Sequence, residues 1–214
     1  STSPLQIIIS IISHKRLLFS LMKRDVVGRY RGSAMGLLWA FLNPVLMLAV
    51  YSFVFSVVFK ARWTGGSDSK TEFALVLFAG LLVFNLFSEC INRAPSLILS
   101  NVNYVKKVIF PLEILPLVAL GSAAFHFLIS VVVWLIFYFR FFGIPSLTIF
   151  QFPLVILPLI MITLGFSWFL ASLGVYMRDV AQIVGLTTTI LMFLSPIFYP
   201  LTALPEEYRG FMQI

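Results

Sequence analysis

Charged side chains are scarce in this sequence. They make up 11% of the 214 residues, whereas hydrophobic residues make up 60%, and the mean hydropathy is +1.03. A soluble domain keeps roughly a quarter of its residues charged. Because a chain of this size cannot hide so much apolar surface from water, the composition excludes a soluble protein. It indicates that the lipid bilayer is the solvent.

Cysteine and nucleotide-binding motifs are also scarce or missing. Cys90 is the single cysteine, which excludes a disulfide framework within the chain. No phosphate-binding loop of the pattern G-x-x-x-x-G-K-S/T occurs in the sequence. We also find neither a metal-ligand cluster nor a carboxylate pair placed for acid–base catalysis. We therefore expect a protein that is not an enzyme and binds no cofactor, and that takes any transport energy from another chain.

Long uncharged runs are what the sequence has instead. A membrane helix needs about 20 apolar residues, and a Gly/Pro-containing loop divides the longest run. The sequence thus predicts an all-α, polytopic membrane bundle, with residues 1–214 forming a single transmembrane domain. The five predicted spans cover about 33–59, 73–93, 113–139, 153–176 and 180–203.

The basic residues predict the orientation of these spans. With a cytoplasmic N-terminus, ten Lys and Arg residues lie inside and five outside, as the positive-inside rule requires. Six of the ten precede the first span, which suits an anionic lipid surface and not a nucleic acid. We expect no cleaved signal peptide and a sixth span beyond residue 214.

Residues 5–31 are predicted to form an amphipathic interface helix. At 100° per residue, polar and basic side chains such as Ser10 and Lys23 gather on one side, and isoleucines such as Ile8 and Ile12 on the other. Such a helix lies in the plane of the membrane interface. Two interpretations stay open: a simple anchor, or a helix whose cationic end meets an anionic lipid-linked substrate.

Small residues recur at intervals of four at Gly28, Gly32, Gly36 and Ala40. Such a row allows close helix packing in lipid, but glycines also permit a bend. We interpret Gly28 and Gly32 as the bend between the interface helix and the first span, and Gly36 and Ala40 as packing residues.

Several further residues invite a functional or a structural interpretation. Glu89 and Arg93 are four apart and should pair on one helical face, and His126 is expected to be a satisfied interior histidine, with a proton relay as the alternative. Asp179 and Gln182 have the spacing of a capping box at the start of the fifth span. Pro196 should end that span.

The cytoplasmic connection over 95–111 carries more polar groups than a turn requires. It is either a topology-setting loop or a docking segment for a soluble partner. The candidate docking residues are Ser100, Asn101, Asn103, Tyr104, Lys106 and Lys107.

Three separate stretches together resemble the membrane subunit of bacterial ABC transporters that export lipid-linked polysaccharides such as O-antigen, capsule or teichoic acid. These are RYRGSAMGLLWAFLNPVLMLAVYSFVF (29–55), NYVKKVIFPLEILPL (103–117) and RDVAQIVGLTTTILMFLSPIFYP (178–200). The resemblance implies a location in the bacterial inner membrane and a homodimer of six-span permeases with two ABC ATPase subunits, which bind ATP and Mg. It implies a channel lined mainly by the first and fifth spans. It also implies a coupling segment at 97–107.

The resulting prediction is ATP-driven export of a polysaccharide on undecaprenyl pyrophosphate from the cytoplasmic side. The guanidinium groups are placed to receive the pyrophosphate, and aromatic residues of the first span to line the pathway. The predicted substrate-binding residues are Arg24, Arg29, Arg31, Tyr51, Phe55 and Phe59. The alternatives are an exporter of drugs or small lipids, an intramembrane polyprenyl-carrier enzyme, and a membrane scaffold.

Overall fold

Helices form all the regular structure in the parts of the chain that the structure describes. The structure is a computed structural model that describes residues 4–54, 70–102 and 110–198, and no strand occurs in those ranges. The predicted all-α bundle is thereby confirmed. The α-helices are α1 (Pro4–Ser13), α2 (Lys15–Tyr30), α3 (Trp39–Phe53), α4 (Lys70–Arg93), α5 (Leu97–Ser100), α7 (Leu115–Phe142), α8 (Phe152–Tyr176) and α9 (Val180–Leu194).

Short 3-10 helices extend several of these elements without a break. They are η1 (Gly36–Leu38), η3 (Ala94–Ser96), η4 (Leu112–Ile114) and η5 (Leu147–Gln151). Among the described residues, four continuous helical segments are long and apolar enough to cross a membrane: Gly36–Phe53, Thr71–Ser100, Leu112–Phe142 and Leu147–Tyr176.

The fifth apolar helix, α9, is shorter. Its 15 residues extend about 22 Å at 1.5 Å per residue, less than the hydrocarbon core of about 30 Å. It ends at Leu194, and Ser195 is extended before Pro196, as expected for a residue that precedes proline. The predicted span continued to 203, but residues beyond 198 lie outside the described ranges.

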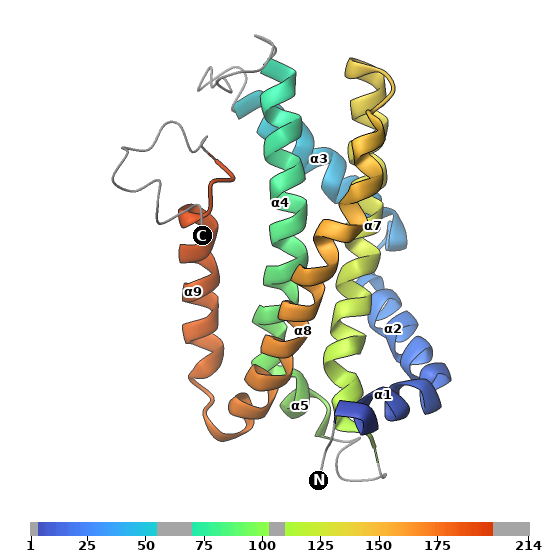
Figure 1. Cartoon of the computed structure of the whole chain (residues 1–214), viewed down its shortest axis with the longest axis vertical. Coiled ribbons are helices and arrows are strands. Elements are labelled where there is room, and N and C mark those ends of the chain that lie inside the picture. Colours follow the sequence, from blue (N-terminus) through green and yellow to red (C-terminus); the bar gives the residue numbers. More distant parts are fainter. Residues whose placement is uncertain (1–3, 55–69, 103–109, 199–214) are drawn as a thin grey trace.

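Helices α4 and α7 stand side by side at the centre of the bundle (Figure 1). Helix α3 crosses obliquely behind them, α8 packs in front, and α9 stands on the far side of α4 from α7. Helices α1 and α2 lie at the lower end, where the turn between α8 and α9 also lies (Figure 1). The spans therefore alternate in direction, as the sequence predicted.

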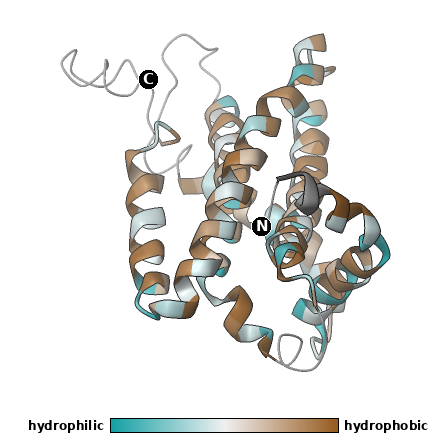
Figure 2. Cartoon of the chain, turned by 60° about the horizontal axis from the view of Figure 1, so that its bottom comes forward, coloured by the Kyte–Doolittle hydropathy of each residue, from teal (hydrophilic) through white to brown (hydrophobic). Residues whose placement is uncertain are grey.

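Aliphatic and aromatic residues from three spans form the centre of the bundle. Leu48 of α3, Leu75 and Phe78 of α4 and Val133 of α7 are buried in one cluster. Nearby, the indole Nε1 of Trp134 donates to the Leu75 carbonyl at 2.9 Å. Hydrophobic residues also cover the outer flanks of the helices, whereas hydrophilic ones mark the lower turn (Figure 2). This distribution is the one expected for a bundle solvated by lipid.

The predicted interface helix is two helices, which meet at His14. Leu21 is buried against Ile114 and Val118 at the start of α7, while Phe19 is 70% exposed. The Ser10 hydroxyl donates to the Glu113 carboxylate at 2.6 Å. The polar side of α1 thus makes at least one contact with the bundle itself.

The bend after α2 uses one of the two predicted glycines, Gly32, together with Gly36 in place of Gly28. Gly32 and Gly36 have φ of +87° and +53°, in the left-handed region that favours glycine, whereas Gly28 lies within α2. A Cβ added to Gly36 meets nothing within 4 Å among the described residues, so Gly36 makes no close helix contact within those residues and its packing role stays a prediction. Ala40 is 4% exposed and is buried in the bundle.

A close backbone approach occurs instead at Gly174 of α8. A Cβ added there would lie 2.1 Å from the carbonyl oxygen of Pro95 in η3. This contact seats the segment that follows α4 directly under α8. At the next turn, Asp179 occupies the N-cap position of α9 but its side chain makes no capping hydrogen bond, so the predicted capping box is wrong.

Candidate functional site

Four charged residues join α2 to α4. Asp25 and Arg29 are four apart on α2, and Glu89 and Arg93 are four apart on α4. The two helices run in opposite directions at this point, so each cation meets the anion of the other helix. We call these four residues the charge clasp.

The geometry of the charge clasp is asymmetric. The Nη2 of Arg93 donates to both carboxylate oxygens of Asp25, at 2.9 and 2.8 Å. The Nη2 of Arg29 donates to Oε1 of Glu89. The Nη1 of Arg93 lies 3.7 Å from the same Glu89 oxygen, which confirms the predicted pairing within α4. Two cations and two anions leave the clasp with no formal net charge.

Burial and charge act in opposite directions on Arg29. Burial lowers the pKa of this guanidinium, but the hydrogen bond and the negative charge of Glu89 outweigh it, so the pKa is raised. Burial also raises the pKa of the neighbouring Tyr30 phenol, and this outweighs the opposing effect of Arg29. Arg29 therefore stays charged and Tyr30 stays neutral at any physiological pH.

Tyr30 connects the charge clasp to the third span. Its hydroxyl oxygen lies 3.1 Å from Nδ1 of His126 in α7, and the two rings meet edge to face. The His126 Nε2 is buried and has no hydrogen-bond partner among the described residues. The expected satisfied histidine is thus satisfied at one nitrogen.

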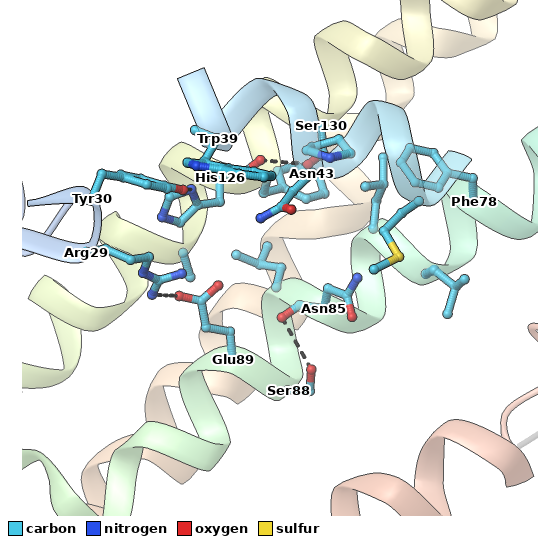
Figure 3. A pocket seen from close by; sticks show the side chains of 18 of the residues that line it. Arg29, Tyr30, Trp39, Asn43, Phe78, Asn85, Ser88, Glu89, His126 and Ser130 are labelled. Carbon is cyan, nitrogen blue, oxygen red and sulfur yellow. Dashed lines mark hydrogen bonds and ion pairs between the residues drawn. The ribbon is translucent and has the colours of Figure 1, made fainter. Parts of the chain in front are cut away.

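A cavity of about 780 Å³ opens above the charge clasp, between α2, α3, α4 and α7. Figure 3 shows Arg29, Tyr30, Glu89 and His126 together at one end and Phe78 at the other. Glu89 and Phe78 are 11 residues apart on α4, which is about 16 Å along a helix. The lining residues with charged, amide, imidazole or hydroxyl groups are Arg29, Tyr30, Ser33, Asn43, Tyr51, Asn85, Ser88, Glu89, His126 and Ser130.

The cavity therefore changes character along its length. Its clasp end offers charged groups and hydroxyls. Its middle offers the amides of Asn43 and Asn85, and its far end is lined by Met47, Phe78 and Leu82. Polar groups within membrane spans mark substrate pathways, and this gradient suits an amphiphile with its polar part at the clasp. No group of three or more metal-ligating side chains occurs in the described parts of the chain.

Of the six predicted substrate-binding residues, the structure brings two into this cavity, Arg29 and Tyr51. Arg24 and Arg31 are exposed on and just after α2 and do not line it. Phe55 and Phe59 lie outside the described ranges. The three arginines thus do not line the cavity together, and Arg29 reaches it where its guanidinium pairs with Glu89 of α4.

The predicted coupling residues are only partly described. Ser100 ends α5, and the Nδ2 of Asn101 donates to the Leu97 carbonyl at 2.8 Å, which closes that short helix. Both lie at the lower end of the molecule, directly after α4 and η3 (Figure 1). The remaining candidates, Asn103, Tyr104, Lys106 and Lys107, lie outside the described ranges.

The sequence analysis missed Asp25, Asn43, Asn85 and Ser130. For Asp25 a signal existed: an acid precedes a base by four residues in both 25–29 and 89–93. Two antiparallel helices carrying that same order necessarily present opposite charges to each other. For Asn43 and Asn85, the signal was an amide within an otherwise apolar run.

The sequence matches proteins of known family over most of its length. A family model described as ABC-2 type transporter matches residues 16–214. An O-antigen export system permease protein RfbA from Myxococcus xanthus is 30% identical over 203 residues, which are 95% of this chain and 75% of that protein. A protein of the same name from Klebsiella pneumoniae is 26% identical over 193 residues, covering 90% of this chain and 72% of the relative.

Proposed function

Because this chain belongs to the ABC-2 type transporter family, we propose that it is the permease subunit of an ATP-driven exporter of a lipid-linked polysaccharide. The substrate is an O-antigen-like polymer on undecaprenyl pyrophosphate. It leaves the cytoplasmic side and crosses the bacterial inner membrane. The observation that carries this proposal is the match to O-antigen export permeases over 95% of the chain.

The energy for export comes from ATP bound with Mg to a separate ABC ATPase subunit. The absence of a phosphate-binding loop from all 214 residues supports this division of labour. Two permease copies and two ATPase copies form the transporter. The lower end of the molecule in Figure 1 is the cytoplasmic end, so the interface helices and the segment after α4 face the ATPase.

The coupling segment at 97–107 transmits movement of the ATPase to the spans. Two contacts support this role. Its beginning is a continuation of α4, and the preceding η3 lies against α8 through Pro95 and Gly174. A displacement of this segment therefore acts on two spans at once. Because packed helices shift as units and do not deform continuously, both spans should move with it.

The clasp end of the cavity receives the charged part of the substrate. Arg29 lines the cavity, and guanidinium groups bind phosphate oxygens bidentately. Arg24 and Arg31 are exposed at the same interface level and attract the anionic carrier from outside the cavity. Tyr51 lines the path farther into the membrane, and Phe55 and Phe59 follow it in the sequence.

An export assay in cells tests this function. A strain that lacks the gene should lose polymer from its surface and accumulate carrier-linked polymer inside, and the re-expressed wild-type chain should restore export. Surface polymer can be measured by immunoblotting of intact cells, with total polymer in lysates as the reference. Unchanged surface polymer in the deletion strain would contradict the proposal. It would favour the alternative, an exporter of drugs or small lipids.

Substitutions then test the substrate-binding residues. Arg29→Gln and Arg31→Gln should each reduce export and lipid-stimulated ATPase activity of the assembled transporter. Arg140→Gln is the matched control, because Arg140 lies in the last turn of α7, at the end of that helix away from α2. It should leave export and ATPase activity unchanged. Normal export in the two α2-region variants would remove the arginines from the mechanism while leaving the transport function intact.

A further inference from the structure

The Arg29 guanidinium is accessible from the cavity and is already paired with a carboxylate. Its side chain is 37% exposed and lines the cavity, yet its Nη2 is paired with Glu89. An anionic ligand that enters the cavity therefore meets a cation that holds a carboxylate. Phosphate and carboxylate oxygens accept the same hydrogen bonds from a guanidinium group, so the two anions compete for one site.

A second cation, Arg93, is close enough to pair with the Glu89 carboxylate if Glu89 leaves Arg29. The Nη1 of Arg93 lies 3.7 Å from Glu89 Oε1 and has no hydrogen-bond partner among the described residues. The other nitrogen, Nη2, is held by Asp25. A small rotation of the Glu89 side chain would therefore give it a full ion pair with Arg93. When Glu89 separates from Arg29, its carboxylate therefore still has a cationic partner. An unpaired, partly buried carboxylate would be costly.

We propose that Glu89 is an internal competitor for the phosphate group of the substrate at Arg29. Before the substrate enters, the Glu89 carboxylate is paired with the Arg29 guanidinium. When the substrate enters, phosphate oxygens take the Arg29 guanidinium and Glu89 turns to Arg93. This inference rests on the proposed function, because it takes the carrier phosphate as the ligand, and it adds a specificity role for Glu89.

The competition would select for ligand charge. A bilayer contains many anionic lipids with a single phosphodiester, and each could otherwise occupy an exposed arginine. A pyrophosphate carries more negative charge and more acceptor oxygens, so it displaces a carboxylate more readily. Because of Glu89, a ligand binds at Arg29 only if it interacts with the guanidinium more strongly than a carboxylate does. A pyrophosphate meets this condition and an ordinary anionic headgroup does not.

The rest of the cavity fits the same ligand. Tyr30, Ser33 and Ser88 line the clasp end and offer hydroxyl donors to further phosphate oxygens. The charge clasp joins the interface helix α2 to the end of α4, so this end of the cavity lies near the level of lipid headgroups. Its apolar far end is open to the hydrocarbon part of an amphiphile.

Binding to the purified full chain in phosphatidylcholine nanodiscs tests the proposal. The probe is undecaprenyl pyrophosphate, and undecaprenyl phosphate, inorganic pyrophosphate and phosphatidylglycerol are separate arms. Glu89→Gln should bind undecaprenyl pyrophosphate at least about fivefold tighter, at the low end of typical coupling between sites. It should also gain affinity for phosphatidylglycerol. Arg29→Gln should weaken binding of undecaprenyl pyrophosphate.

The double variant Arg29→Gln/Glu89→Gln decides between competition and a general charge effect. Competition predicts that the gain from Glu89→Gln disappears when Arg29 is absent; a gain that persists would overturn the proposal. Equal or weaker binding by Glu89→Gln would also overturn it. Glu72→Gln, at the other end of α4, is the control of matched charge and should change nothing.

Two further measurements keep the test independent of folding and of the proposed function. Glu89→Asp keeps the charge but withdraws the carboxylate by one methylene, so it should give a smaller gain in affinity than Glu89→Gln. If the wild-type chain exports polymer but neither variant binds the probe more tightly, this inference fails and the proposed function stands. If export itself fails in the cell assay, the proposed function falls first.

Discussion

The contact between Gly174 and Pro95 makes the sharpest prediction about stability. Gly174→Ala would place a Cβ 2.1 Å from the Pro95 carbonyl oxygen and 2.7 Å from its carbonyl carbon and Cα. All three neighbours belong to the chain backbone and cannot rotate away. To reach 3.0 Å, the shortest separation that real Cβ atoms show, η3 and α8 must move apart by about 0.9 Å.

Overpacking of this kind costs about 1–3 kcal/mol. For a chain of about this length, 2 kcal/mol corresponds to a fall in Tm of roughly 4–8 °C. Gly165→Ala is the matched control, because Gly165 lies in the same helix and an added Cβ meets nothing within 4 Å. Both changes bring the same difference in helix propensity, so their comparison isolates the steric effect.

Thermal unfolding of the purified chain in one detergent, followed by tryptophan fluorescence, measures the difference. We expect Gly174→Ala to unfold several degrees below Gly165→Ala and to weaken the coupling of ATPase activity to export. Equal Tm values for the two variants would refute the close approach of η3 to α8. In that case the contact would also lose its role in transmitting movement from the coupling segment.

Three other substitutions test the bend and the charge clasp by the same unfolding assay. Gly32→Ala should lower the free energy of unfolding by about 1–2 kcal/mol because the φ of Gly32 is +87°. Gly28→Ala, within α2 and with free space around it, should be neutral or stabilising. The reverse order of stability would contradict the location of the bend. Tyr30→Phe removes one hydrogen bond, worth about 1 kcal/mol, and Tyr176→Phe at an 86% exposed position should have no effect. Arg93→Gln should cost about 1.5–3 kcal/mol, the range for a hydrogen bond to a charged group, and an unchanged Tm would show that α2 is held by its apolar face alone.

The family and the fold could be predicted from the sequence to a large extent. Three motif stretches in the right order were enough to identify an ABC transporter permease, and the match to the ABC-2 type transporter family confirms this, while export of a polysaccharide stays a proposal. The spans followed from hydropathy because a bilayer imposes one length on every crossing helix. The helical structure of residues 5–30 was predicted too, although its division at His14 was not, and the interface location of these helices stays a prediction.

The candidate site could be predicted only in part. Arg29 was identified by its charge at the mouth of a span, and Tyr51 by its position among aromatic residues of the first span. Their common cavity depends on how α2, α3, α4 and α7 meet, and no local pattern contains that information. Arg24 and Arg31 carry the same local signal as Arg29, yet of the three it is Arg29 that lines the cavity.

The sequence by itself determined that this chain is a membrane protein, which residues form its spans, and which charged residues lie near the ends of the spans. These properties depend on composition and on periodicity along one helix. The tertiary structure alone decided that Asp25 meets Arg93, that Glu89 occupies Arg29, and that Gly174 admits Pro95. Those contacts depend on the relative direction and register of different helices, which is set by the packing of the whole bundle.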